Sequence, residues 1–181
     1  MRCSWVDENC EVYVRYHDEE WGKPVHDDRK LLEMLILEGF QAGLSWLTVL
    51  KKRPAFVEEF SGFNPEKVAK FDEVKIEKML QNPQIIRSRQ KNCAAVNNAG
   101  IFLQIQREFG SFDRYLWSFT NSKVQNYGIF PCPVRNELSD TISKDLKKRG
   151  MKYVGSVIIY SYLQAVGVIN DHEPQCFCHT V

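Results

Sequence analysis

Four residues near the two ends of the chain have the chemistry of a metal site. Cys3 and His17 lie near its start, and His172 and Cys176 lie four positions apart near its end. Two thiolates and two imidazoles complete a tetrahedral ligand set for Zn²⁺, and a spacing of four on a helix or helical turn can direct two side chains toward one ion. Spacing alone favours ordinary packed cysteines and hydrogen-bonded histidines, and three further side chains offer alternative ligands: Cys178, His26 and His179. If the first four bind zinc, no coordination position remains for water, and the ion is structural.

Glu38 is a carboxylate on an apolar stripe. At helical spacing it shares one face with Leu31, Met34 and Leu35, so its side chain is drawn inward unless the helix turns it to a rim. A carboxylate that points inward needs a donor or a cation. The same window is equally consistent with a side chain that reaches solvent or pairs with a nearby cation. A ligand with an exocyclic amine, such as a nucleobase, would supply the missing donor.

Large aromatic side chains are concentrated in the first quarter of the chain. Flat rings can sandwich a nucleobase, and stacking contributes about 1 to 3 kcal/mol per base. Aromatic rings more often fill a hydrophobic core, and that alternative stays open for each ring taken singly. The residues concerned are Trp5, Tyr13, Tyr16, Trp21 and Trp46.

The elements that must position these residues have helical periods, and strand-like alternation is scarce, so the sequence predicts an all-α fold. One helix begins after a cap at Asp27 or Asp28, and another begins at Ser45 and runs toward Val57, with a kink or break at Pro54. The stretch 120–136 is predicted to be irregular, and a helix is predicted to begin at Ser139. The predicted helices span 30–41, 45–57, 65–70, 74–80, 87–109, 112–119, 139–150 and 155–166.

Composition sets wide limits on function. The 181 residues are 44% apolar, which is enough for a single domain over 1–181, either undivided or built as two helical lobes with the base pocket between them. The first residues are not apolar, and no long apolar stretch is uninterrupted, so we expect neither a secretion signal nor a membrane span. Six cysteines without such a signal indicate reduced thiols or metal ligands in the cytoplasm. A net charge of +1 leaves nucleic-acid binding open, because only one basic face is needed.

Several separated blocks of the sequence, in the same order, resemble the 3-methyladenine DNA glycosylase I family. The resemblance runs from Cys3 to Cys176 and is far more specific than a lone motif. The blocks are Cys3-x-Trp5, Tyr16-His17-Asp18-x-Glu20-Trp21-Gly22, Leu37-Glu38-Gly39-x-Gln41-Ala42-Gly43-Leu44-Ser45-Trp46, Leu146-Lys147-Lys148-Arg149-Gly150, and Gly155 through Asn170-Asp171-His172 to Cys176.

The resemblance implies a helix-hairpin-helix glycosylase fold in which zinc joins the N- and C-terminal segments. The implied zinc ligands are Cys3, His17, His172 and Cys176. The implied base pocket is built by Tyr16, Trp46 and Glu38, with Trp5, Tyr13 and Trp21 as neighbouring aromatics. The helix-hairpin-helix would cover about 75–103. Its turn departs from the glycine-containing pattern of the superfamily, because Gln84 stands where a glycine is expected and the preceding Pro83 has no backbone N–H to donate.

The implied activity is hydrolytic excision of N3-methylated adenine from alkylated double-stranded DNA by a monomer, as a base-excision repair enzyme. The nucleotide must be flipped out of the stack, and Leu44 is the candidate wedge that fills the gap, with a place in the hydrophobic core as an equal alternative. Glu38 is assigned to recognition and electrostatic stabilisation of the transition state. The predicted DNA contacts are Gln84, Arg87, Arg89 and Lys91, joined on one basic face by Lys147, Lys148 and Arg149.

Two alternatives come from other functional classes. A zinc-stabilised protein that binds alkylated DNA without catalysis would keep the fold and pocket but release no base. A metallohydrolase would have three protein ligands and a water on an open zinc site, and chelation would remove its activity before its fold.

Overall fold

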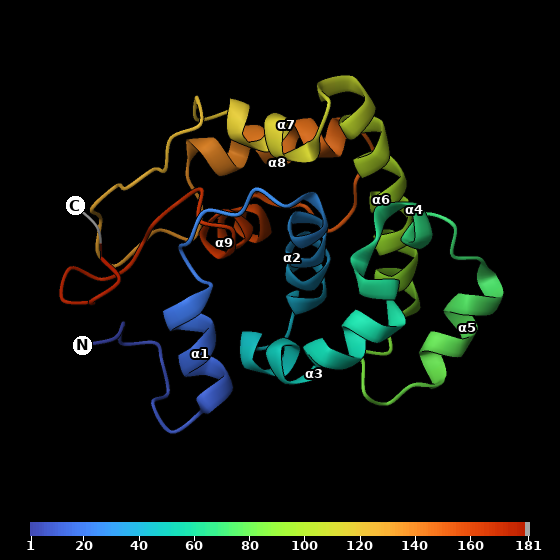
Figure 1. The fold of residues 1–181 in the computed structure, drawn as a ribbon, viewed down its shortest axis with the longest axis horizontal. Coiled ribbons are helices and arrows are strands. Elements are labelled where there is room, and N and C mark those ends of the chain that lie inside the picture. Colours follow the sequence, from blue (N-terminus) through green and yellow to red (C-terminus); the bar gives the residue numbers. More distant parts are fainter. Residues whose placement is uncertain (180–181) are drawn as a thin grey trace.

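The computed structural model describes residues 1–179, and their secondary structure is helical, as predicted (Figure 1). Within this part of the chain the only β-type pairing is an isolated bridge between Gln125 and Ile169. The helices are α1 (Glu11–Glu19), α2 (Asp28–Gln41), α3 (Trp46–Glu59), the 3₁₀ helix η1 (Ser61–Phe63), α4 (Pro65–Val68), α5 (Glu73–Gln81), α6 (Arg89–Phe109), α7 (Phe112–Ser118), α8 (Glu137–Lys148) and α9 (Ser156–Ala165).

Helix α2 lies at the centre of the molecule, with α9 on one side, α6 on the other and α3 at its C-terminal end (Figure 1). Its side chains from Leu31 to Phe40 are buried almost without interruption, because helices cover it on several sides. A single cluster of buried apolar side chains extends from Cys3 to Cys176. The described N- and C-terminal segments both lie on the side of α1 and α9, so residues from the two ends can meet there.

Side-chain caps fix where most helices begin. Asp27 accepts a hydrogen bond from the backbone N–H of Lys30, and Ser45 accepts one from Thr48, so both predicted caps are confirmed. The predicted start at Ser139 is wrong, because Asn136 is the cap of α8 and Ser139 completes a capping box in its first turn. Likewise Ser88 caps α6, which therefore begins two residues later than predicted.

Helix α3 continues through Pro54 without the break that proline can cause. Phe56 and Phe60 follow the proline and are fully buried, and their rings pack together and against Phe40 of α2. The burial of these rings offsets the backbone hydrogen bond that Pro54 cannot donate.

Helix α1 is missing from the sequence-based prediction. Its N-cap residue, Cys10, makes no capping hydrogen bond through its side chain, so the acidic Glu11 in the first turn is the one local signal of its start. None of the helices in residues 1–179 is both long and apolar enough to cross a membrane.

Candidate functional site

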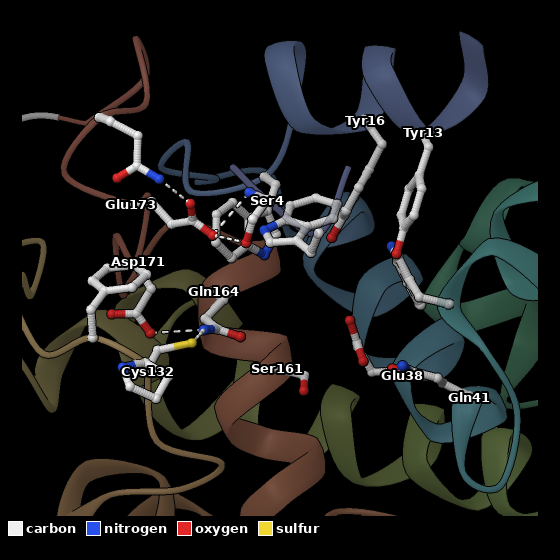
Figure 2. A pocket seen from close by; sticks show the side chains of 16 residues that line it. Ser4, Tyr13, Tyr16, Glu38, Gln41, Cys132, Ser161, Gln164, Asp171 and Glu173 are labelled. Atoms are coloured by element: carbon white, nitrogen blue, oxygen red, sulfur yellow. Dashed lines mark hydrogen bonds between the residues drawn. The ribbon is translucent and has the colours of Figure 1, made fainter. Parts of the chain in front are cut away.

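A cavity of about 670 Å³ opens between α1, α2 and α9 (Figure 2). It contains all six side chains that the sequence assigns to a pocket, although they come from separate segments. Helix α1 contributes Tyr13 and Tyr16, α2 contributes Glu38, and α3 begins with Trp46. The six are Trp5, Tyr13, Tyr16, Trp21, Glu38 and Trp46.

Glu38 points from α2 into this cavity (Figure 2). Its residue is only 3% exposed, and its Oε2 atom has no hydrogen-bond partner among residues 1–179. Burial raises the pKa of the carboxyl from 4.5 to about 8, because desolvation opposes the charged form. Of the two predicted positions for the side chain of Glu38, inward or toward solvent, the structure shows the inward one. The carboxyl oxygen without a partner could be satisfied by a hydrogen-bond donor or a cation.

Aromatic rings form the wall around Glu38. Tyr16 and Trp46 lie with their ring centroids 5.4 Å apart, and the indole N–H of Trp46 has no acceptor in the described part of the chain. Burial, followed by the charge of Glu38, holds the pKa of Tyr16 well above its usual value, so the phenol stays neutral. Trp5 packs edge-on against Tyr13 and Trp21, at 5.1 and 5.0 Å. The cavity thus combines flat apolar faces with an unpaired acceptor and an unpaired donor.

A second group of side chains, next to this wall, could hold a metal ion. Ligand atoms of Cys3, His17, His172 and Cys176 lie within 4.8 Å of one another, and all four residues are buried. The Cys3 sulfur is 3.4 Å from His172 Nδ1, and the Cys176 sulfur is 3.4 Å from His17 Nε2. The predicted alternative ligands are not in the cluster: Cys178, His26 and His179.

The surroundings orient these four side chains. His17 Nδ1 lies 2.7 Å from a carboxylate oxygen of Asp18, and His172 Nε2 lies 3.1 Å from the carbonyl oxygen of Trp21, so each imidazole turns its other nitrogen to the cluster. Burial lowers the pKa of His172 to about 4, which keeps the ring in its neutral, metal-binding form. Gly22 approaches His172 so closely that a Cβ there would lie 2.9 Å from Nε2.

The metal cluster and the aromatic wall are in direct contact. The ring of Trp21 packs 4.6 Å from that of His172, and Trp5 packs 5.3 Å from His17. Two of the pocket aromatics therefore rest directly on two of the four possible metal ligands. If the four side chains of the cluster lost their fixed positions, Trp21 and Trp5 in the cavity wall would lose the rings against which they pack.

A family model for methyladenine glycosylase matches residues 5–179. The chain belongs to the methyladenine glycosylase family. It is 45% identical to the "DNA-3-methyladenine glycosylase 1" of Escherichia coli strain K12, over 98% of this chain and 96% of that protein.

Solved structures agree with this family membership. A crystal structure of 3-methyladenine DNA glycosylase I superimposes with a TM-score of 0.95 at 45% identity, and covers 99% of this chain and 100% of that one. A tyrosine-to-phenylalanine variant of such an enzyme, solved in complex with 3-methyladenine, superimposes with a TM-score of 0.92 at 37% identity, over 97% and 95% of the two chains. The all-helical fold is thus shared with methyladenine glycosylases.

The opposite wall of the cavity in this methyladenine glycosylase is polar, and sequence reasoning missed it (Figure 2). Asp171 accepts hydrogen bonds from Tyr160 and Gln164, at 2.6 and 2.7 Å, and Glu173 accepts one from the backbone N–H of Ser4 at 2.9 Å. Asp171 lies within a block that carries the family resemblance, which is the one signal that points to it. The other lining residues that the prediction missed are Gln41, Phe130, Pro131, Cys132, Ser161 and Gln175.

The predicted DNA contacts fall into two groups. Leu44 is 42% exposed at the C-terminal end of α2, and Gln84 and Arg87 are exposed in the turn between α5 and α6. Arg89 instead pairs with Glu73 and Glu77, and the ammonium of Lys91 donates to the carbonyl oxygens of residues 40 and 42, at 2.9 and 2.7 Å. Lys91 therefore ties α6 to the end of α2, next to Leu44.

The predicted basic face does not extend to residues 147–149. Arg149 pairs with Glu108, near the C-terminal end of α6, whereas Arg87 precedes its N-terminal end. Helix α6 has 21 residues and is about 30 Å long, so the two ends are far apart. The expectation that these basic residues gather near the hairpin is wrong. Two basic sequence motifs do not reveal that the length of α6 lies between them.

Proposed function

We propose that this protein is a DNA-3-methyladenine glycosylase I, which excises 3-methyladenine from alkylated double-stranded DNA. One observation carries the proposal: the buried carboxyl of Glu38 lacks a partner and faces an aromatic cavity large enough for a purine. The relatives reported above carry the same activity in their names.

Recognition follows from the charge of the methylated base. Methylation at N3 makes adenine cationic, so the rings of Tyr16 and Trp46 attract it by cation-π interaction. In the free protein the raised pKa keeps Glu38 protonated at neutral pH. A bound cation favours the carboxylate form, which attracts the cationic base and accepts a hydrogen bond from its exocyclic amine. A neutral, unmethylated adenine gains neither the cation-π attraction nor the attraction to the carboxylate of Glu38. The pocket therefore discriminates by charge as well as by shape.

The chemistry breaks the bond between the sugar C1′ and N9 of the base. The bonding electrons pass to the cationic base, which leaves neutral, and a water molecule adds at C1′ and gives up one proton. Because the leaving group is already activated by its charge, the protein needs to supply little acid or base assistance. Glu38 lowers the barrier by electrostatic stabilisation of positive charge in the transition state.

Access to the base requires that the nucleotide be flipped out of the duplex. We assign Leu44 as the side chain that enters the gap, because it is exposed beside the cavity residue Gln41. We assign α5, its turn and α6 as the helix-hairpin-helix, over about 75–103, with Gln84 and Arg87 near the phosphates. In the turn, the backbone N–H of Gln84 donates to the side chain of Asn82, at 2.9 Å, so phosphate binding depends more on the charge of Arg87.

The metal is proposed to be a structural Zn²⁺ held by Cys3, His17, His172 and Cys176. With Zn–S and Zn–N bonds of about 2.3 and 2.1 Å, a tetrahedral ion separates sulfur and nitrogen ligands by about 3.6 Å. The shortest sulfur–nitrogen distances in the cluster are 3.4, 3.4 and 3.6 Å, which fit that geometry. Four protein ligands leave no position for a water, which argues against a metallohydrolase. We further propose one glycosylase domain that acts as a monomer in the cytoplasm.

Release of the free base tests the proposed activity. Methylated duplex DNA incubated with the purified protein is expected to release 3-methyladenine, separated by chromatography, with no 7-methylguanine. Glu58→Gln, at an exposed position on α3, serves as a control that changes the charge without touching the cavity. Binding of methylated DNA without any released base would instead identify a non-catalytic binder and contradict the proposal.

Arg87→Ala is expected to weaken binding to duplex DNA uniformly across sequences and to reduce the slope of log K against log salt by about 1. The reason is that Arg87 is exposed and forms no ion pair among the described residues, so its charge is available to a phosphate. Arg89→Ala is the matched control, because that guanidinium is already paired with Glu73 and Glu77. Binding would be measured by fluorescence anisotropy over a salt series, and equal slopes for the two variants would contradict the assignment.

A further inference from the structure

The three residues proposed to contact the base belong to three different helices. Tyr16 lies on α1, Glu38 on α2 and Trp46 at the start of α3. Their relative positions therefore depend on how these three helices are joined, and not only on each side chain. Among the helices, α1 packs chiefly against α3. Its other contacts, through His17 and Asp18, are with the terminal segments and do not fix its distance from α2.

One guanidinium joins these same three helices behind the pocket. Arg53 of α3 donates from its two terminal nitrogens to the carboxylate of Glu20, at 2.9 and 2.8 Å, and Glu20 is the C-cap residue of α1. Its third nitrogen, Nε, donates to Glu33 of α2 at 2.6 Å. Lys30 of α2 adds a contact of 3.0 Å to Glu20, so the cluster contains two positive and two negative groups.

These contacts are shielded from solvent, which makes them stronger than surface ion pairs. The side chains of Arg53 and Glu33 are only 15% and 12% exposed. Burial favours the neutral form of Arg53, but the hydrogen bonds to Glu20 and Glu33 outweigh it and raise its pKa. Burial also opposes the ionisation of Glu20, but the bonds and charge of Arg53 outweigh it and lower the pKa of that carboxyl.

Packing alone does not support Tyr16 on this side. A cavity of about 250 Å³ lies behind it, lined by Tyr16, Glu20, Leu50 and Arg53 among others. If the link between Arg53 and Glu20 were lost, α1 would have space in which to shift, and Tyr16 would move with it. The ionic cluster supplies the support that packed side chains would otherwise give.

We infer that Arg53 is a positioning residue for excision: its simultaneous bonds to Glu20 and Glu33 hold Tyr16 at the distance from Glu38 and Trp46 that the methylated base requires. The inference rests on the proposed function. A lysine at the same position keeps the positive charge but has a single nitrogen. It cannot reproduce the two bonds to Glu20 and the third bond to Glu33. A positive charge at position 53 is therefore not enough to hold Tyr16 in place.

Arg53→Lys tests this inference against a control that the chain itself provides. Arg149 has the same arrangement, with two nitrogens on Glu108 at 2.6 and 3.1 Å and Nε on Asp145 at 2.7 Å, but it joins α6 and α8 and does not line the cavity. Both lysine variants would be compared with the wild type by thermal unfolding, affinity for duplex DNA, single-turnover excision and affinity for free 3-methyladenine.

Both variants are expected to unfold at slightly lower temperature and to bind duplex DNA as the wild type does. Arg53→Lys is expected to excise about 10- to 100-fold more slowly and to bind free 3-methyladenine more weakly, because a small misplacement of a contacting group costs rate on that scale. Arg149→Lys is expected to match the wild type in both measurements. Arg53→Lys that behaves like Arg149→Lys would overturn the inference while the proposed function stands. A wild type that releases no base would overturn the proposed function, and affinities for the free base would still decide the role of Arg53.

Discussion

Replacing Glu38 with glutamine is expected to slow single-turnover excision of 3-methyladenine by about 100-fold, which is typical when one electrostatic contact to the transition state is lost. Glutamine has nearly the same shape but carries no charge to attract the cationic base. Excision would be followed with enzyme in excess over methylated duplex DNA. The exposed Glu58→Gln is the control for the change in net charge. Excision by Glu38→Gln at a near-normal rate would contradict the role assigned to the carboxylate.

The same substitution is expected to stabilise the fold at and above neutral pH. Below pH 4.5 the carboxyl is protonated in the folded and unfolded chains alike. As the pH rises from 4.5 to about 8, the unfolded chain ionises at Glu38 while the folded chain keeps the proton, so the free energy of unfolding falls. The loss approaches about 5 kcal/mol at 1.36 kcal/mol per pKa unit.

Glutamine does not titrate, so Glu38→Gln avoids this loss. Its unfolding temperature should exceed that of the wild type by an increasing margin as the pH is raised from 5 to about 8. Calorimetry of the two proteins across this range gives the measurement. Parallel pH profiles would mean that the buried carboxyl is not protonated in the folded state. Together the two effects make Glu38 a residue that serves activity at a cost in stability.

Cys176→Ser is expected to release the bound zinc and to lower the unfolding temperature by about 10 °C, on the scale of 2 to 4 °C per kcal/mol for a protein of this size. The reason is that metal affinity for the folded chain contributes directly to its stability. Zinc content would be measured by elemental analysis of the purified variant, and unfolding by calorimetry.

Cys178→Ser is the matched control for this substitution, because Cys178 lies two residues away and outside the ligand cluster. It is expected to keep both zinc and stability. Loss of zinc from Cys178→Ser, with full zinc content in Cys176→Ser, would exchange the roles of the two thiols. Excision by Cys176→Ser should also fall, because Trp21 and Trp5 rest on His172 and His17.

The sequence predicts those helices that have both a capping residue at the start and a clear apolar stripe in the same short stretch of chain. Helix α2 has a capping aspartate and a continuous apolar stripe, so its C-terminal limit and its cap could be predicted, although it begins two residues earlier than expected. The inward position of Glu38 is one of two alternatives that the stripe leaves open, and the structure selects it. Helix α1 is amphipathic but has only nine residues and no side-chain cap, and the packing of its aromatic side chains against distant segments supports it.

Contacts between distant segments account for the rest of what was missed. Lys91 has the composition of a phosphate contact, but carbonyl groups 49 and 51 positions away occupy its ammonium. The polar wall of the cavity comes largely from irregular segments around Cys132 and Asp171, which have no periodic pattern, and partly from Ser161 and Gln164 of α9. The four possible metal ligands are the exception, because their residue types suggest the set and the family resemblance selects it, and the structure brings them together in spite of their separation.

The position of the metal ligands along the chain also constrains how the protein is made. Ribosomes add residues from the N-terminus, so Cys3 and His17 are synthesised long before the other two ligands. His17 and Cys176 are 159 positions apart, which corresponds to about 8 to 30 s at typical rates of synthesis. During that interval the half-built site exposes a thiol and an imidazole to oxidants and to competing metals. Loading with the proposed zinc would therefore be a late step, and the wall formed by Trp5 and Trp21 would gain its final support only then.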